Sequence, residues 1–402
     1  MSLQALPSAE RLHIGFFGRR NAGKSSVVNA VTGQSLAIVS DVLGTTTDPV
    51  SKAMELLPLG PVVIIDTPGI DDEGELGSLR VQKSYGVLHK TDIAVLVVDA
   101  GEGLREEDRR LIETFQKKTI PYLIVYNKID RSPFQPSGER EIAVSAQTRE
   151  GVEELKNRLA ALCREEKREK TIVSHLLSPG EMVVLVVPID GSAPKGRLIL
   201  PQQQTIRDLL DHHCLVTVVQ DTELSEALQA LKDPPRLVIT DSQAFARVSR
   251  DTPEDIPLTS FSILFANYKG NLKQAVEGVT AIGRLKDGDR VLISEGCTHH
   301  RQCGDIGTVK LPALLRRFTG GKELSLSWSS GTEFPEDLSE YRLVIHCGGC
   351  MLNEKEMQYR LRCAREQNVP MTNYGTAIAY MNGILRRSLS IFPELAAKLP
   401  ES

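Results

Sequence analysis

The sequence contains no apolar run long enough to cross a membrane. Its longest apolar stretches, residues 93–98 and 182–187, are far shorter than the roughly 18 residues that a membrane span needs. The first residues also lack the basic start and apolar segment of a secretory signal. We therefore expect a cytoplasmic protein that does not act on a membrane.

Neither sign of charge dominates, and aromatic residues are few. The chain has 48 Lys and Arg against 52 Asp and Glu, which gives a net charge of −4. This balance offers no general basic field that would attract nucleic acid. With 5% aromatic residues and one Trp, there are also few rings on which bases could stack. We therefore expect no nucleic acid among the partners.

The length and the alternation of elements predict several α/β domains. A chain of 402 residues exceeds the size, about 250 to 300 residues, at which a single hydrophobic core stops growing. Apolar strand-like runs alternate with helical segments throughout, which is typical of parallel sheets covered by helices. A charged stretch at 163–171 is typical of a helix end that leads into a linker. We predict domains at residues 1–169, 170–262 and 263–402.

A phosphate-binding loop follows the first predicted strand. Residues 18–25 read GRRNAGKS, which matches G-x-x-x-x-G-K-[ST] and leads into a predicted helix. The glycines let backbone N–H groups surround phosphates, Lys24 neutralises the β and γ oxygens, and the Ser25 hydroxyl can bind Mg2+. A glycine-rich turn that merely begins a helix is the alternative for this motif taken alone.

Two motifs that contact the γ-phosphate in P-loop GTPases come next in the expected order. Residues 44–47 supply switch hydroxyls, and residues 66–69 read DTPG after an apolar strand. In such a site Asp66 holds Mg2+ through water and the Gly69 N–H senses the γ-phosphate. Because Ile70 follows this motif, no glutamine stands ready to orient the attacking water, and we expect slow intrinsic hydrolysis.

The water could instead be oriented by an acidic residue just beyond this motif. The candidates are Asp71, Asp72, Glu73 and Glu75, of which we favour Glu75. The predicted catalytic residues are Lys24, Thr46, Asp66, Gly69 and Glu75.

Two later motifs identify the base as guanine. Residues 127–130 read NKID after a strand, and the Asp130 carboxylate can accept two hydrogen bonds from guanine that adenine cannot supply. Ser145 and Ala146 follow another strand as the loop that supports the base. The nucleotide is therefore predicted to be GTP. The predicted nucleotide-binding residues are Gly18, Arg19, Arg20, Asn21, Ala22, Gly23, Lys24, Ser25, Ser26, Thr45, Thr46, Asp66, Gly69, Asn127, Lys128, Asp130, Ser145 and Ala146.

These five motifs make residues 11–165 resemble the GTPases of the Era and MnmE kind. The resemblance implies that Asn21 accompanies K+ binding, together with carbonyls of residues 40–44. It also implies that Thr46 is the switch residue that binds Mg2+ beside Ser25. The chain has Thr47 where that group usually has Arg.

A second group of chemically active residues lies near the C-terminus. Of seven cysteines, five fall after residue 296, and two motifs follow predicted strands directly: Cys297-Thr-His299 and His346-Cys347-Gly-Gly-Cys350. A reducing compartment disfavours disulfides, and ligands of open α/β sheets lie beyond the carboxyl ends of strands. The spacing fits a zinc site with three cysteines and one histidine as well as a 4Fe-4S cluster with an exchangeable position. Buried cysteines without a metal are the third alternative.

The order of the motifs along the whole chain resembles the HydF family, the maturation GTPases of iron-iron hydrogenases. The resemblance implies a 4Fe-4S cluster held by Cys297, Cys347 and Cys350, with a labile fourth position for His299, His346 or an outside ligand. It implies a scaffold that receives the 2Fe subcluster precursor from radical-SAM maturases and delivers it to the apo-hydrogenase. The middle section would then be a dimerisation domain and the last section an iron-sulfur domain, in a homodimer able to assemble further.

A rival hypothesis is a translation- or tRNA-linked GTPase with a zinc module that binds RNA. The few aromatic residues and the sparse basic residues near the C-terminal cysteines argue against it. A dithiol redox enzyme that uses Cys347 and Cys350 is disfavoured because Cys297 and His299 follow a second strand. Cys303 is the remaining cysteine that could enter the site if its loop folds back.

Overall fold

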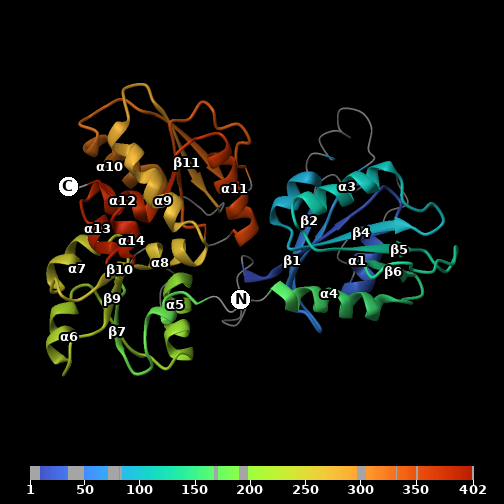
Figure 1. The fold of residues 1–402 in the computed structure, drawn as a ribbon, viewed down its shortest axis with the longest axis horizontal. Coiled ribbons are helices and arrows are strands. Elements are labelled where there is room, and N and C mark those ends of the chain that lie inside the picture. The colour runs from blue at the N-terminus through green and yellow to red at the C-terminus, as the bar shows by residue number, and fades with distance from the viewer. Residues whose placement is uncertain are drawn as a thin grey trace. The chain divides into compact units, whose positions relative to one another are not determined.

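The computed structural model describes residues 10–34, 49–70, 81, 84–166, 171–189, 198–296, 305–331, 333–349 and 352–400. The chain forms two units, whose elements are drawn in Figure 1. The first consists of Met1–Arg168 with Asn353–Glu356, and the second of Glu169–Leu352 with Met357–Ser402. Both are built from sheets with helices on their faces, so the predicted α/β fold class is confirmed.

The first unit contains one six-stranded sheet in the order β2-β3-β1-β4-β5-β6. Neighbouring strands run parallel except β2, which is antiparallel to β3. The strands are β1 Leu12–Phe17, β2 Val50–Leu56, β3 Gly60–Asp66, β4 Ile93–Asp99, β5 Tyr122–Asn127 and β6 Glu141–Val144. The helices are α1 Lys24–Thr32, α3 Glu106–Lys117 and α4 Val152–Glu166, with a 3-10 turn η2 at Leu88–Lys90.

The central strands of this sheet form because both of their faces are covered. All six residues of β5 are buried, and in β4 only the terminal Asp99 is not. Near-continuous apolar sequence is typical of such parallel strands. On α3, Leu111 and Phe115 lie four positions apart and face the core, while acidic residues occupy the first turn, where the helix dipole favours them.

The edge strand β2 was not predicted from the sequence. Most of its side chains are exposed, and polar residues interrupt its apolar ones. It forms through its backbone pairing with β3, from Val50 opposite Asp66 to Leu56 opposite Gly60. An exposed edge strand therefore lacks the apolar pattern that revealed its neighbours.

The second unit contains two four-stranded sheets, both fully parallel, in the orders β10-β9-β7-β8 and β12-β11-β13-β14. The strands are β7 Met182–Val186, β8 Leu215–Val219, β9 Leu237–Thr240, β10 Leu258–Ser260, β11 Arg290–Glu295, β12 Ser325–Ser330, β13 Leu343–His346 and β14 Met371–Asn373.

The helices that follow Arg168 are α5 Leu200–Asp211, α6 Leu224–Ala230, α7 Phe245–Asp251, α8 Phe261–Tyr268, α9 Leu272–Val279, α10 Leu311–Phe318, α11 Glu354–Glu366, α12 Tyr374–Met381, α13 Leu385–Ser388 and α14 Pro393–Ala396. Short turns of other helical types are η3 Ser174–Leu176, η4 Thr280–Arg284 and η5 Ile306–Lys310.

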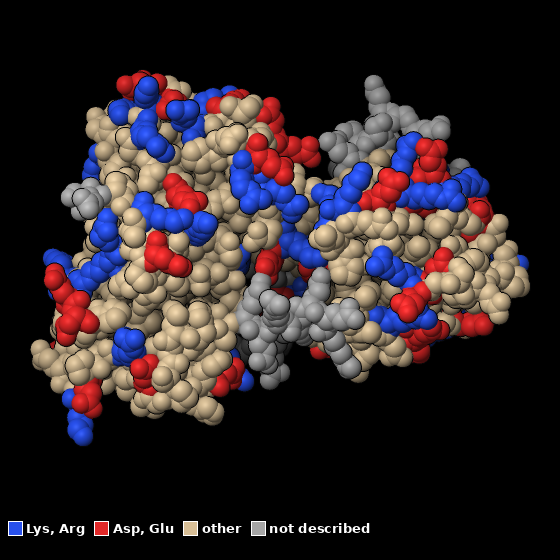
Figure 2. Space-filling view, in the orientation of Figure 1, with Lys and Arg blue, Asp and Glu red and all other residues tan. Residues whose placement is uncertain are grey.

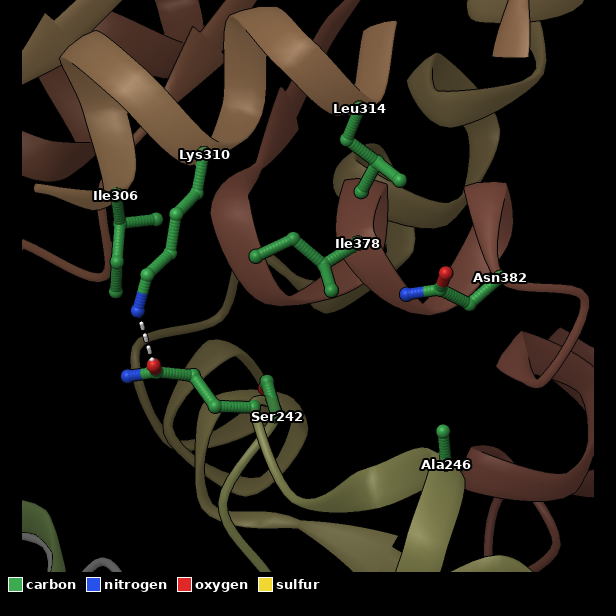
Figure 3. A pocket seen from close by; sticks show the side chains of 8 residues that line it. Ser242, Ala246, Ile306, Lys310, Leu314, Ile378 and Asn382 are labelled. Atoms are coloured by element: carbon green, nitrogen blue, oxygen red, sulfur yellow. Dashed lines mark hydrogen bonds between the residues drawn. The ribbon is translucent and has the colours of Figure 1, made fainter. Parts of the chain in front are cut away.

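These two sheets share a core. One cluster of buried side chains includes Leu185 of β7 and Ile293 of β11, together with residues of α8, α9 and α12. A pocket of about 300 Å3 lies between the loop after β9 and helices α10 and α12. Figure 3 shows Lys310 at this pocket. Its Nζ donates a hydrogen bond of 2.7 Å to Gln243, which also lines the pocket. The second and third predicted sections therefore pack against each other, and the domain boundaries given above stay a prediction.

The strands predicted to precede the two cysteine motifs are present as β11 and β13. Two short strands, β10 and β14, had not been predicted. Each of these two strands has only three residues, too few for a pattern to be recognised.

Among the described residues, no helix is both long and apolar enough to span a membrane. On the face drawn in Figure 2, Lys and Arg side chains are interspersed with Asp and Glu side chains on both units.

Candidate functional site

The phosphate loop lies between the end of β1 and the start of α1, and its shape depends on two glycines. Gly18 has φ 141°, and a Cβ there would lie 2.2 Å from the Val97 carbonyl oxygen. Gly23 has φ 89°, and its Cβ would lie 2.2 Å from Asn127 Nδ2. Asn21 also has positive φ, 58°, a conformation that Asn tolerates better than most residues. The backbone can therefore wrap closely around a phosphate only with these residue types.

The residues expected to contact phosphate and Mg2+ meet at the start of α1. Lys24 Nζ donates to the carbonyls of Gly18 (2.9 Å) and Arg19 (2.8 Å). The Ser25 hydroxyl donates to Asp66 Oδ2 at 2.6 Å, while the buried Asp66 Oδ1 has no hydrogen-bond partner among the described residues. Burial raises the pKa of Asp66, although the Ser25 hydrogen bond and the Lys24 charge oppose this shift. A buried carboxylate with an unused oxygen beside a hydroxyl fits a Mg2+ site.

The base-recognition residues also hold the phosphate loop. Asn127 Nδ2 donates to the Ala22 carbonyl at 3.0 Å, and Lys128 Nζ donates to the Asn21 carbonyl at 2.6 Å. On its other side, Asn127 Oδ1 accepts from the Ala146 N–H at 3.1 Å. These bonds tie the ends of β1, β5 and β6 together, so the loop and the base site form one framework.

Asp130, the predicted guanine-reading residue, is held by the same framework. Its Oδ1 accepts a hydrogen bond of 2.6 Å from the Ser145 hydroxyl. Ser145 is fully buried and also accepts from the Thr148 N–H at 3.1 Å. The carboxylate is therefore oriented before any base arrives.

The Arg19 side chain takes a role that sequence reasoning missed. Its Nε donates to Asp108 at 3.0 Å, its NH1 to Glu102 at 2.6 Å and its NH2 to the Gly103 carbonyl at 3.1 Å. Burial lowers the pKa of Arg19, yet hydrogen bonds and charge from Glu102 and Asp108 outweigh it and raise that pKa. Arg19 thus anchors the phosphate loop to α3, and only its backbone remains for a nucleotide.

The other predicted nucleotide-site residues are only partly described. Ser26 lies in the first turn of α1, and Gly69 is buried shortly after β3. Thr45, Thr46 and Glu75 lie outside the described residues. The predictions that rest on them stay predictions.

Cys347 follows β13 directly and lies against the end of β11. Its Sγ accepts hydrogen bonds from the N–H groups of Gly296 (3.1 Å) and Gly349 (3.3 Å), and its own N–H donates to the Ser294 carbonyl (2.8 Å). Gly296 immediately precedes Cys297 in the chain. N–H donors to sulfur suit a cysteine that binds a metal as a thiolate, because they stabilise its negative charge.

The remaining predicted ligands Cys297, His299 and Cys350, and also Cys303, lie outside the described residues. Within the described part of the chain, no group of three or more His, Cys, Asp or Glu side chains is arranged to hold a metal ion.

His346 is the predicted ligand whose surroundings are described in full. The side chain is buried, with Nε2 at 3.0 Å from Arg360 NH1 and Nδ1 at 2.7 Å from the Cys347 carbonyl. Burial, and next the Arg360 charge, lower the pKa of His346 to about 3. The ring is therefore neutral at ordinary pH. Arg360 comes from α11 and had not been singled out in the sequence.

Glu295 is a second neighbour of Cys347 that sequence reasoning missed. It ends β11 and is buried, and its Oε1 accepts from the Tyr374 hydroxyl at 3.1 Å. Burial raises the pKa of Tyr374, and the negative charges of Glu295 and Cys347 add to this shift. Its position at a strand end before a cysteine was the one signal available in the sequence.

Comparison with protein families matches each section of the chain. A family model described as the hydrogen maturase F dimerization domain matches residues 172–270, and one described as the hydrogen maturase F tetramerization domain matches residues 273–391. Together these models span more than half of the chain. The chain belongs to the hydrogen maturase F family, HydF. The expected dimerisation function of the middle section is thereby confirmed, and the HydF models add a tetramerisation domain after it.

The first section of this HydF chain is a GTPase domain. Residues 13–128 match a model described as a 50S ribosome-binding GTPase. The tRNA modification GTPase MnmE of Chromobacterium violaceum is 34% identical over 156 residues, 37% of this chain and 34% of that protein. GTPase Der of Maridesulfovibrio salexigens is 40% identical over 127 residues, 30% of this chain and 28% of that protein. The chain thus spans about a third of the length of these relatives.

A crystal structure of Era from Aquifex aeolicus, solved with GDP and aluminium fluoride, is also similar. It aligns with 59% of this chain and 97% of its own at 18% identity, with a TM-score of 0.35.

Gly23→Ala should abolish tight nucleotide binding, because the new Cβ would displace Asn127 from its place against the phosphate loop. Gly33→Ala is a matched control: Gly33 ends α1 with φ 66°, and a Cβ there meets no described atom within 4 Å. Both variants should lose about 1–2 kcal/mol of stability from left-handed strain. Only Gly23→Ala should weaken binding of a fluorescent GDP analogue, by more than about tenfold. Equal affinities in the two variants would contradict this role of Gly23.

Proposed function

We propose that this HydF chain is a K+-stimulated GTPase that carries a 4Fe-4S cluster and serves as a scaffold for the 2Fe subcluster precursor. Radical-SAM maturases would supply the precursor, and an apo iron-iron hydrogenase would receive it. The observation that carries the proposal is the position of Cys347 at the end of β13, against Gly296 at the end of β11. In a HydF chain, this register supports the convergence of Cys297 and Cys347 on one site.

The nucleotide site supports GTP hydrolysis with Mg2+. Lys24 Nζ would exchange its bonds to the Gly18 and Arg19 carbonyls for phosphate oxygens. Ser25 and Thr46 would bind Mg2+, which neutralises charge between the β- and γ-phosphates, and Asp66 would hold it through water. Asp130 would accept from the guanine N–H groups. Gly69 would donate its N–H to the γ-phosphate, and Glu75 is the residue proposed to orient water.

K+ should stimulate GTP hydrolysis through Asn21. A positive charge supplied beside the transferring phosphate by an arginine finger is worth roughly 10^3 to 10^5 in rate in related enzymes. Turnover in K+ should therefore greatly exceed turnover in Na+. Asn21→Gly is the informative variant because glycine keeps the positive φ of this position while it removes the amide. It should lose the preference for K+ and still bind GDP. Equal wild-type rates in K+ and Na+ would refute the proposal.

The cluster would be held by thiolates of Cys297, Cys347 and Cys350, with the fourth iron open to His299 or an outside ligand. Such a cluster supplies a soft, redox-active anchor with one exchangeable position. The Gly296 and Gly349 N–H groups would stabilise the Cys347 thiolate. An open position would let a precursor bind and later leave.

Replacement of Cys297, Cys347 or Cys350 by Ser should remove the cluster, because a hydroxyl is a poor substitute for a soft ligand. Iron content and the EPR spectrum of anaerobically purified protein measure this. Lys24→Ala is the control, since it should abolish nucleotide binding and leave iron content unchanged. Stoichiometric zinc without iron in the wild-type protein would favour the rival zinc-containing GTPase.

The edge strand β8 is the proposed dimer contact. Its only partner strand among the described residues is β7, and Leu215 and Val218 are exposed on it although they are apolar. An exposed apolar edge strand is a template for pairing with another chain. In a domain of the HydF dimerization family, a second copy is the partner that fits this edge.

Val218→Lys should reduce the size of the oligomer in light scattering, because a charge on an edge strand opposes pairing. Val50→Lys is a close control: Val50 is 44% exposed and Val218 45%, and both lie on edge strands. The Val50 variant should keep the wild-type oligomer. If Val218→Lys also keeps it, the dimer contact lies elsewhere.

A further inference from the structure

The buried Arg360 occupies one of the two ring nitrogens of His346. A guanidinium group has only hydrogen-bond donors, so His346 Nε2, at 3.0 Å from Arg360 NH1, must accept. The ring proton of a neutral imidazole is then on Nδ1, which donates to the Cys347 carbonyl at 2.7 Å. Arg360 itself is fully buried, and its NH2 donates to the Gly331 carbonyl at 2.6 Å. Neither nitrogen of His346 therefore keeps a lone pair for iron.

The Arg360 guanidinium is also fixed in orientation. It lies over the Phe334 ring, 5.0 Å from the centroid, and the same ring lies 6.5 Å from that of His346. A cation over an aromatic face is stabilised electrostatically, more so where water is excluded. One packed group is thus formed by Arg360, Phe334 and His346, the residue that precedes Cys347 in the chain.

A second cation holds the other side of the same loop. Lys269, the residue that follows α8, donates from Nζ to the Gly349 carbonyl. The loop cannot easily shift, because Gly349 has φ 61° and a Cβ there would lie 2.7 Å from Met357 Sδ. The Gly349 carbonyl therefore accepts directly from the cation Lys269. The Cys347 carbonyl accepts from His346, whose other ring nitrogen bonds the cation Arg360.

We infer that His346 is a positioning residue and not an iron ligand, and that Arg360 and Lys269 supply the positive charge behind the cluster loop. The inference rests on the proposed function, because it concerns the 4Fe-4S cluster. Three thiolates outweigh the positive charge of the iron-sulfur core, so the bound cluster is an anion, and reduction adds a further negative charge. Fixed cations nearby stabilise the reduced form more than the oxidised form.

The ligand question is tested with His346→Asn in the full-length protein, reconstituted with iron and sulfide. The Asn amide can keep a donor near the Cys347 carbonyl but offers no imidazole. Iron content should stay at the wild-type level, and the nitrogen couplings in pulsed EPR of the reduced cluster should be unchanged. Loss of an imidazole coupling in this variant would overturn the inference. A wild-type protein without any iron-sulfur cluster would instead refute the proposed function, and this inference with it.

The charge question is tested by redox titration of variants with full iron content. Arg360→Gln and Lys269→Met should each shift the midpoint potential to more negative values, whereas Lys269→Arg should stay near wild type. Lys310→Met is the matched control, since it removes a cation that bonds Gln243 in the same unit. If Arg360→Gln does not fold, Lys269→Met decides the question. Unchanged potentials in the cation-removing variants would show that these residues only support the loop.

Discussion

Both sites depend on one constraint: the carboxyl ends of parallel strands lie at the same edge of a sheet. In the first unit this edge collects the loop after β1, Asp66 at the end of β3, and Asn127 at the end of β5. In the second unit it places Cys347, after β13, against Gly296, after β11. Backbone pairing alone thus brings together residues that are far apart in the chain.

Buried charged side chains need partners of suitable charge or hydrogen-bonding capacity, and the chain supplies these differently at Arg19, Asp66 and Arg360. Arg19 and Asp108 are both buried and bond each other, so each stabilises the charge of the other. Asp66 keeps one oxygen without a partner among the described residues, which is understandable where a cation is to bind. Arg360 directs its donors to an imidazole and a carbonyl. The first arrangement supports the fold, the second suits the nucleotide site, and the third lies beside the proposed cluster loop.

Strands and site residues could be predicted from the sequence alone where function or burial produces a local pattern of residue types. The phosphate loop was predictable because its glycines are required by close approaches, and β4 and β5 because burial on both faces keeps them apolar. Strand β2 was not predictable, since it forms by pairing at an exposed edge. The partners of Arg19 and His346 were also hidden: Asp108 lies 89 positions after Arg19, and Arg360 lies in α11, the helix that follows the cysteine motif. Such pairs depend on packing, which no local pattern encodes.

The two sites also follow the same electrostatic logic. GTP phosphates and the proposed thiolate-bound iron-sulfur cluster are both anions, which favour a positive potential around them. At the phosphate loop, backbone N–H groups and Lys24 provide the positive potential. At the proposed cluster loop, the N–H groups of Gly296 and Gly349 point at the sulfur of Cys347. Lys269 bonds the Gly349 carbonyl, and Arg360 bonds the His346 ring. In each case, backbone N–H groups and cations together provide the positive potential that an anion needs. In the proposed scaffold, the 4Fe-4S cluster would stay bound in this potential, while the 2Fe precursor binds at its exchangeable position and leaves again.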